Sequence, residues 1–163
     1  MKKKLMLAFL LILFLVLDNS FIPFFAVRGY YPSLLFVFAI CYSIINEDWS
    51  GLWIGMFSGM LQDLYFFKGF GVNTFLNILL CVTAAQVGKS LFKEKSLIPI
   101  ITVFILTVVK GVGIFTVLYM LGVYSHIEVA LFNGVYNLVI AVIMYRRVYN
   151  LCQKPYMMKT WKF

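Results

Sequence analysis

The run of residues 49–67 is the feature that most constrains how this chain can fold. It reads WSGLWIGMFSGMLQDLYFF and is long enough to cross a bilayer as a helix. On a helix, Gly51, Gly55 and Gly59 fall on one face, and Asp63 continues that face. Three glycines on one face let a neighbouring helix come within backbone contact, which is how helices associate in lipid. A carboxylate inside lipid costs at least about 2.5 to 3.5 kcal/mol, so we expect Asp63 to face protein, water or a cation.

The rest of the chain is also strongly apolar. It is 63% hydrophobic and only 12% charged over 163 residues, a balance that would leave a soluble domain with large exposed apolar patches. Apolar runs that suit a hydrocarbon core of about 30 Å occur six times. We therefore predict an all-α integral membrane protein, a six-transmembrane-helix bundle in one membrane domain (residues 1–163), with spans at about 5–23, 32–45, 49–67, 72–87, 97–121 and 129–145.

The first run resembles a signal peptide, because three lysines precede a stretch of large aliphatic residues. No small-x-small cleavage site follows it. The polar residues Asp18, Asn19 and Ser20 come instead, and Pro23 follows shortly after. We therefore interpret the run as an uncleaved first helix that ends near Pro23.

The basic residues give the orientation. With the N-terminus inside and six crossings, the outer loops hold only Arg28 and Lys68. The cytoplasmic segments hold eleven basic residues: Lys2, Lys3, Lys4, Lys89, Lys93, Lys95, Arg146, Arg147, Lys154, Lys159 and Lys162. This bias predicts that both termini are cytoplasmic. The net charge of +8 is therefore interpreted as a topology signal, with contacts to membrane lipid and none to nucleic acid.

Five polar residues are predicted to meet at one depth in the membrane. At a rise of 1.5 Å per residue, Asp63 lies about 21 Å from the start of its helix, while Lys110 and Asp18 each lie about 20 Å from theirs. Asn77 and Asn133 reach a similar level on helices that run inward. We expect Lys110 to form an ion pair with Asp63 or with Asp18. The alternatives are that Lys110 extends to the interface, that Asp63 only marks a helix end, and that the amides merely link helices.

The sequence lacks the residue groups that common enzyme mechanisms need. The only histidine, His126, is expected in an outer turn, which rules out a two-histidine metal motif within the membrane. Glu47 and Asp48 form a lone acidic pair that suits a solvated turn. We predict no catalytic residues, no cofactor and no metal site, and therefore a protein that is not an enzyme.

Two stretches of the chain resemble the rod shape-determining protein family MreD. The first span ends in a polar-Phe-x-Pro step, from Asn19 to Pro23. The glycine-rich span then leads through Asp63 into a turn with Gly69 and Gly71, followed by Asn-Thr. The resemblance implies a multi-pass protein of the bacterial cell (inner, cytoplasmic) membrane that belongs to the cell-elongation complex. It also implies binding to an MreC-like bitopic protein and, through it, indirect association with MreB, RodA and a penicillin-binding protein in lateral peptidoglycan synthesis.

The resemblance also implies a fold similar to the substrate-binding subunits of energy-coupling-factor transporters. An alternative function is therefore a vitamin-binding S subunit of such a transporter. Those subunits usually carry small residues in the first helix, whereas residues 5–17 here contain only Ala8 as a small residue. In the adaptor function, the glycines would pack within the bundle or receive the helix of MreC. We expect Gly55→Leu to disturb packing more than Ser58→Leu, because we place Ser58 on another face.

Overall fold

The computed structural model describes residues 2–26, 31–46, 49–65, 71–90, 97–123, 127–155 and residue 157. Within these residues every regular element is helical, which confirms the prediction of an all-α chain with six α-helices. They are α1 (Lys2–Ser20), α2 (Leu34–Asn46), α3 (Ser50–Asp63), α4 (Val72–Lys89), α5 (Leu97–Met120) and α6 (Glu128–Cys152), and a short 3₁₀ helix, η1 (Ile22–Phe25), follows α1. His126, Glu47, Asp48, Lys68 and the end of the run 49–67 lie outside the described residues.

Helix ends differ from the expected spans in two places. Helix α3 ends at Asp63, so it is shorter than the apolar run that contains it. Helix α6 continues to Cys152 instead of ending near residue 145. The reason is that Arg146 and Arg147 are good helix formers, so a change in polarity there does not stop the helix.

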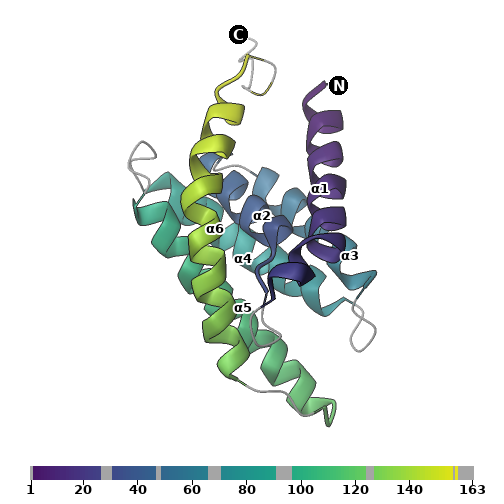
Figure 1. Ribbon diagram of the computed structural model, residues 1–163. Coiled ribbons are helices and arrows are strands. Elements are labelled where there is room, and N and C mark those ends of the chain that lie inside the picture. Colours follow the sequence, from purple (N-terminus) through teal and green to yellow (C-terminus); the bar gives the residue numbers. More distant parts are fainter. Residues whose placement is uncertain are drawn as a thin grey trace.

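Helix α2 forms the centre of the bundle (Figure 1). It is in contact with each of the other five α-helices, and every residue from Leu35 to Ile45 is buried. Its sequence is apolar on all sides, as expected of a helix surrounded by others. With 13 residues it is about 20 Å long, which is shorter than a hydrocarbon core of about 30 Å. By length and composition, α5 and α6 are each sufficient to cross a membrane.

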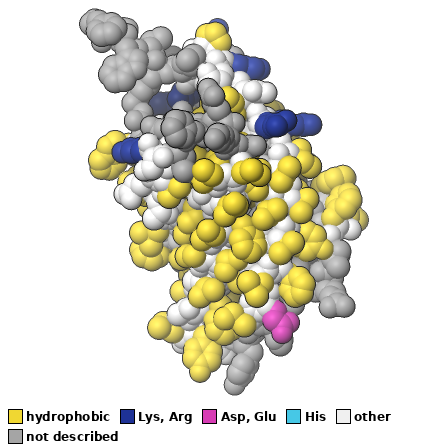
Figure 2. Space-filling view, turned by 90° about the vertical axis from the view of Figure 1, so that its left-hand side faces the viewer, with side chains coloured by type: hydrophobic (Ala, Val, Ile, Leu, Met, Phe, Trp, Pro, Cys, Tyr) yellow, Lys and Arg dark blue, Asp and Glu magenta, His cyan; other side chains and the backbone are white. Residues whose placement is uncertain are grey.

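The outer surface is largely apolar. Large hydrophobic side chains on several helices are more than half exposed, including Phe9, Phe57, Phe75, Ile105 and Val142. Figure 2 shows hydrophobic side chains as a broad field over one face, with Lys and Arg side chains gathered toward one end. The start of α1 and the end of α6 lie at that end in Figure 1. An apolar exterior with a basic end is typical of a protein surrounded by lipid.

The glycine face of α3 packs directly against α4. A Cβ atom added at Gly51 would lie 2.8 Å from the backbone oxygen of Cys81, and one added at Gly55 would lie 2.6 Å from that of Asn77. A Cβ at Gly59 would lie 2.8 Å from the backbone oxygen of Asn73. The glycines therefore meet successive turns of α4, and no side chain fits between the two helices. Of the two roles expected for this face, packing within the bundle is the one that the structure shows.

The placement of Ser58 on another face was wrong. Its side chain is fully buried, its hydroxyl donates to the backbone oxygen of Gly55 at 3.1 Å, and it accepts from Asn77 at 3.3 Å. On a helix, residue 58 is three positions from Gly55 and therefore shares its side. Phe57, which is 51% exposed, is one of the positions on α3 that face away from the bundle.

We expect Gly55→Leu to lower the free energy of unfolding by about 1 to 3 kcal/mol, because the new side chain would force the backbones of α3 and α4 apart. The measurement is thermal or denaturant unfolding of the purified protein in mild detergent. Phe57→Leu is the matched control, and we expect it to change stability by less than about 0.5 kcal/mol. Equal losses from the two substitutions would contradict close packing of α3 on α4.

Candidate functional site

Asp63 caps the start of helix α4. Its two carboxylate oxygens accept hydrogen bonds from the backbone N–H groups of Asn73 at 3.0 Å and Thr74 at 2.9 Å. The Thr74 hydroxyl adds a third bond at 2.6 Å. The first N–H groups of a helix have no partner within the helix, and the helix dipole makes them favourable for an anion. Asp63, only 2% exposed, is therefore stabilised inside the protein by a helix N-terminus.

Asp18 does the same for helix α2. Its carboxylate accepts from the backbone N–H groups of Leu34 at 2.7 Å and Leu35 at 3.1 Å, and from the Ser33 hydroxyl at 2.9 Å. The Ser33 hydroxyl oxygen in turn accepts from the backbone N–H of Phe36 at 3.2 Å, as an N-cap residue does. The helix pairs α1–α2 and α3–α4 are thus joined in the same way: a carboxylate near the end of one helix binds the N-terminus of the next.

Lys110 donates to Gln62 and not to either carboxylate. The distance from its Nζ atom to Gln62 Oε1 is 2.6 Å, and Nζ also lies 4.4 Å from the centre of the Phe36 ring. Lys110 is only 7% exposed, so this amide and this ring take the place of water around the ammonium group. The prediction of a direct ion pair between Lys110 and Asp63 or Asp18 was therefore wrong. The two carboxylates bind helix N-termini instead, and the ammonium group of Lys110 binds Gln62.

Gln62 and Ser33 connect Lys110 to the rest of a buried network. The Gln62 side-chain nitrogen donates to Ser33 Oγ at 3.0 Å, and that hydroxyl donates to Asp18. The Asn77 amide nitrogen donates to Gln62 Oε1 at 3.0 Å. A chain of hydrogen bonds therefore joins α1, the start of α2, α3, α4 and α5.

Asn137 adds the sixth helix to this network. Its side-chain oxygen accepts from the backbone N–H of Ser33 at 2.8 Å, and its nitrogen donates to Thr107 Oγ1 at 3.3 Å. Asn137 and Thr107 are both buried, and they lie on α6 and α5 respectively. We call the set Asp18, Ser33, Ser58, Gln62, Asn77, Thr107, Lys110 and Asn137 the polar network; it includes residues from, or next to, all six helices.

The charges in and beside the polar network balance. Each helix N-terminus carries the equivalent of roughly half a positive charge. Two such termini together with one lysine offset the two carboxylates of Asp18 and Asp63. An unbalanced charge in lipid would be costly, and this set of opposite charges keeps the region close to neutral.

The sequence placed most, but not all, of this site. Asp18, Asn77 and Lys110 enter the polar network as expected, and Asp63 lies beside it as a helix cap. Asn133 does not: its side-chain oxygen is buried without a hydrogen-bond partner among the described residues, and Asn137, one turn later on α6, takes the expected place. Sequence reasoning also missed Gln62 and Ser33, although both are next to residues that it had considered.

The chemistry of the network is that of a structural link. Its hydroxyl and amide groups bind each other and helix ends, and the Asp and Lys groups lie on different helices with neutral partners between them. Among the described residues, no three His, Cys, Asp or Glu side chains are grouped as a metal site would require. Cys41 and Cys81 are buried as free thiols.

We expect Asp63→Ala to loosen the first turn of α4 specifically. Two buried N–H groups would lose their acceptor at a cost of about 2 kcal/mol, which corresponds to roughly 30-fold faster local amide exchange. Hydrogen–deuterium exchange should show this at residues 73–76 and leave 34–37 unchanged. Asp18→Ala is the matched control and should give the reverse pattern. Uniform acceleration in both variants would contradict the local capping roles.

Comparison with known proteins gives one match. The chain matches the model of a family described as rod shape-determining protein MreD over residues 1–155. No curated protein and no solved structure matches the chain. The family determines rod cell shape from the membrane and is not a known enzyme family. Since the match covers nearly the whole sequence, this chain belongs to the MreD family of rod shape-determining proteins.

Proposed function

We propose that this chain is a non-catalytic adaptor of the cell-elongation (rod) complex that binds an MreC-like bitopic membrane protein. The observation that supports this is the family match over residues 1–155. Through MreC the adaptor would associate indirectly with MreB, RodA and a penicillin-binding protein, and so contribute to lateral peptidoglycan synthesis. The polar network and the glycine face suit this role, because both make a rigid bundle that presents a fixed surface.

The proposed location is the bacterial inner membrane, with six crossings and both termini in the cytoplasm. An even number of helices returns the chain to its starting side, and the start of α1 and the end of α6 lie at the same end of the bundle (Figure 1). Lys89 lies in the last turn of α4, and Arg146 and Arg147 lie toward the end of α6, a distribution that fits the positive-inside rule. The cytoplasmic end would then lie against anionic lipid.

The proposed partner helix binds outside the glycine face. Gly51, Gly55 and Gly59 face α4, so a second helix has no access to them. The exposed apolar side chains of the outer surface remain as the available contact area.

The vitamin-binding alternative is not supported. The family match describes a shape-determining protein, and no solved structure matches the chain. A vitamin site at the depth of the polar network would meet side chains that largely bind one another, from Lys110 and Gln62 to Ser33 and Asp18. A ligand at this level would have to replace bonds that link the helices.

The direct test is affinity purification of the tagged full-length chain from its native membrane in mild detergent, followed by mass spectrometry. We expect an MreC-like bitopic protein and wall synthases to copurify. The Gly55→Leu variant is informative beside it, because loss of the bundle should also lose the partner, whereas Phe57→Leu should leave a folded bundle. Copurification of paired ATPases with a transmembrane coupling subunit would contradict the adaptor function.

A further inference from the structure

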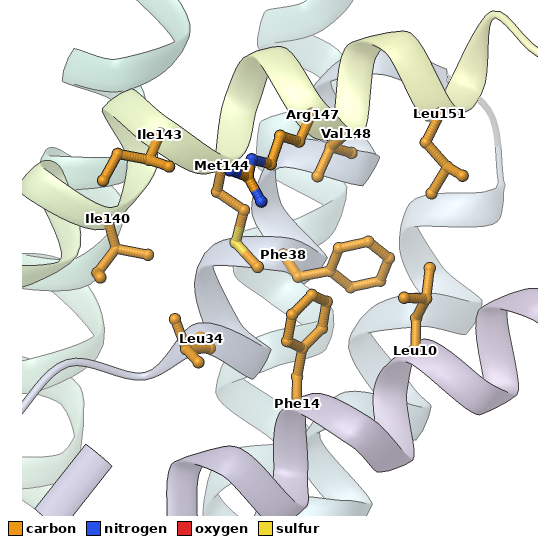
Figure 3. Close-up of a pocket in the computed structure, with 10 residues that line it drawn as sticks. All are labelled: Leu10, Phe14, Leu34, Phe38, Ile140, Ile143, Met144, Arg147, Val148 and Leu151. Carbon is orange, nitrogen blue, oxygen red and sulfur yellow. The ribbon is translucent and has the colours of Figure 1, made fainter. Parts of the chain in front are cut away.

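An open groove lies between α1 and α6. Leu10 and Phe14 of α1 form one wall, residues from Ile140 to Leu151 of α6 form the other, and Phe38 of α2 lies at the base (Figure 3). No Cα atom of α1 lies within 8 Å of one in α6 among the described residues. The two helices are therefore held apart by α2, and the groove is the space that they leave.

The dimensions of the groove fit a hydrocarbon chain. It has a volume of about 320 Å³. From residue 140 to residue 151, α6 rises about 16 Å along the groove. An extended hydrocarbon chain, with carbon contacts of about 4 Å, needs a space about 4 to 5 Å wide.

One charged residue lines this apolar groove. Arg147 is the only ionisable side chain among the ten lining residues, and Figure 3 shows its guanidinium beside Met144, over the groove. It lies toward the end of α6, at the end of the bundle that also carries the lysines at the start of α1. From Arg147 to Ile140 the lining runs about 10 Å toward the middle of the bundle and is apolar.

We propose that the groove between α1 and α6 binds one acyl chain of an anionic phospholipid whose phosphate is held by Arg147. A guanidinium forms two parallel hydrogen bonds with a phosphate, and basic pockets between transmembrane helices on the cytoplasmic side suit anionic headgroups. The acyl chain runs from Arg147 toward Ile140, between the phenyl ring of Phe14 and α6. This proposal does not rest on the binding of MreC, and the site differs from a general attraction of basic loops to the membrane.

The test is native mass spectrometry of the purified, delipidated full-length protein with added phosphatidylglycerol or phosphatidylethanolamine. We expect one phosphatidylglycerol to bind per chain, at least about fivefold more tightly than phosphatidylethanolamine. Arg147→Gln should weaken phosphatidylglycerol binding about tenfold. Arg146→Gln removes the same charge from a neighbouring residue outside the groove and should change binding less than twofold. Equal effects of the two arginines, or equal affinity for the two lipids, would overturn the site.

A photoreactive residue in place of Ile143 identifies the occupant in native membranes. Ile143 lines the groove, whereas Val142 is similarly exposed and does not. The proposal requires phospholipid adducts at position 143 to exceed those at position 142 by severalfold. Crosslinks at position 143 that lead mainly to another protein helix or to a second copy of this chain would contradict it.

Discussion

The hydrogen bond from Lys110 to Gln62 is the interaction on which the rest of the bundle depends. Lipid supplies no hydrophobic force that drives helices together, so packing and polar contacts must hold them. Gln62 joins the lysine on α5 to Ser33 and, through it, to Asp18 on α1. Removing Gln62 would leave a buried ammonium group beside the Phe36 ring without its hydrogen-bond acceptor, the costly state for a charge away from water.

The two capping carboxylates explain how acidic residues can lie in an apolar bundle. Asp63 and Asp18 each use a neighbouring helix N-terminus as the positive partner. This arrangement fixes the geometry of each hairpin, because the carboxylate must reach the first N–H groups of the next helix. The glycine face of α3 also contributes to this geometry, because it lets α4 come close enough for Asp63 to cap it.

The features that were predictable from sequence are those that depend on composition and on the spacing of residues along one helix. Repeated apolar runs indicate helices, and a four-residue glycine spacing indicates a close helix contact, but neither identifies the neighbouring helix. The burial of Asp63 followed from the cost of a charge in lipid. The hydrogen-bond partner of Asp63 could not be predicted in this way. It is the start of the next helix, α4, and a sequence does not specify helix ends to the residue.

The errors have the same origin. Asn133 and Asn137 share a face of α6 and differ by one turn, so only the position of the α2 start decides which of them is bonded. Gln62 was overlooked beside the charged Asp63, although a neutral amide that both donates and accepts is better suited to join a lysine to a hydroxyl. Helical spacing alone does place Ser58 beside the glycine face, because it lies three positions from Gly55; the prediction was wrong because it counted only residues four apart as members of that face.

A double-mutant cycle between Gln62 and Lys110 tests the central claim most directly. The variants Gln62→Leu, Lys110→Met and their combination are compared with the unaltered protein by equilibrium unfolding in detergent. Because each single change leaves the other group buried without its partner, the two losses should not add, and we predict a coupling free energy of about 1 to 2 kcal/mol. A coupling below about 0.5 kcal/mol would contradict the claim that this contact holds the polar network and the six helices together.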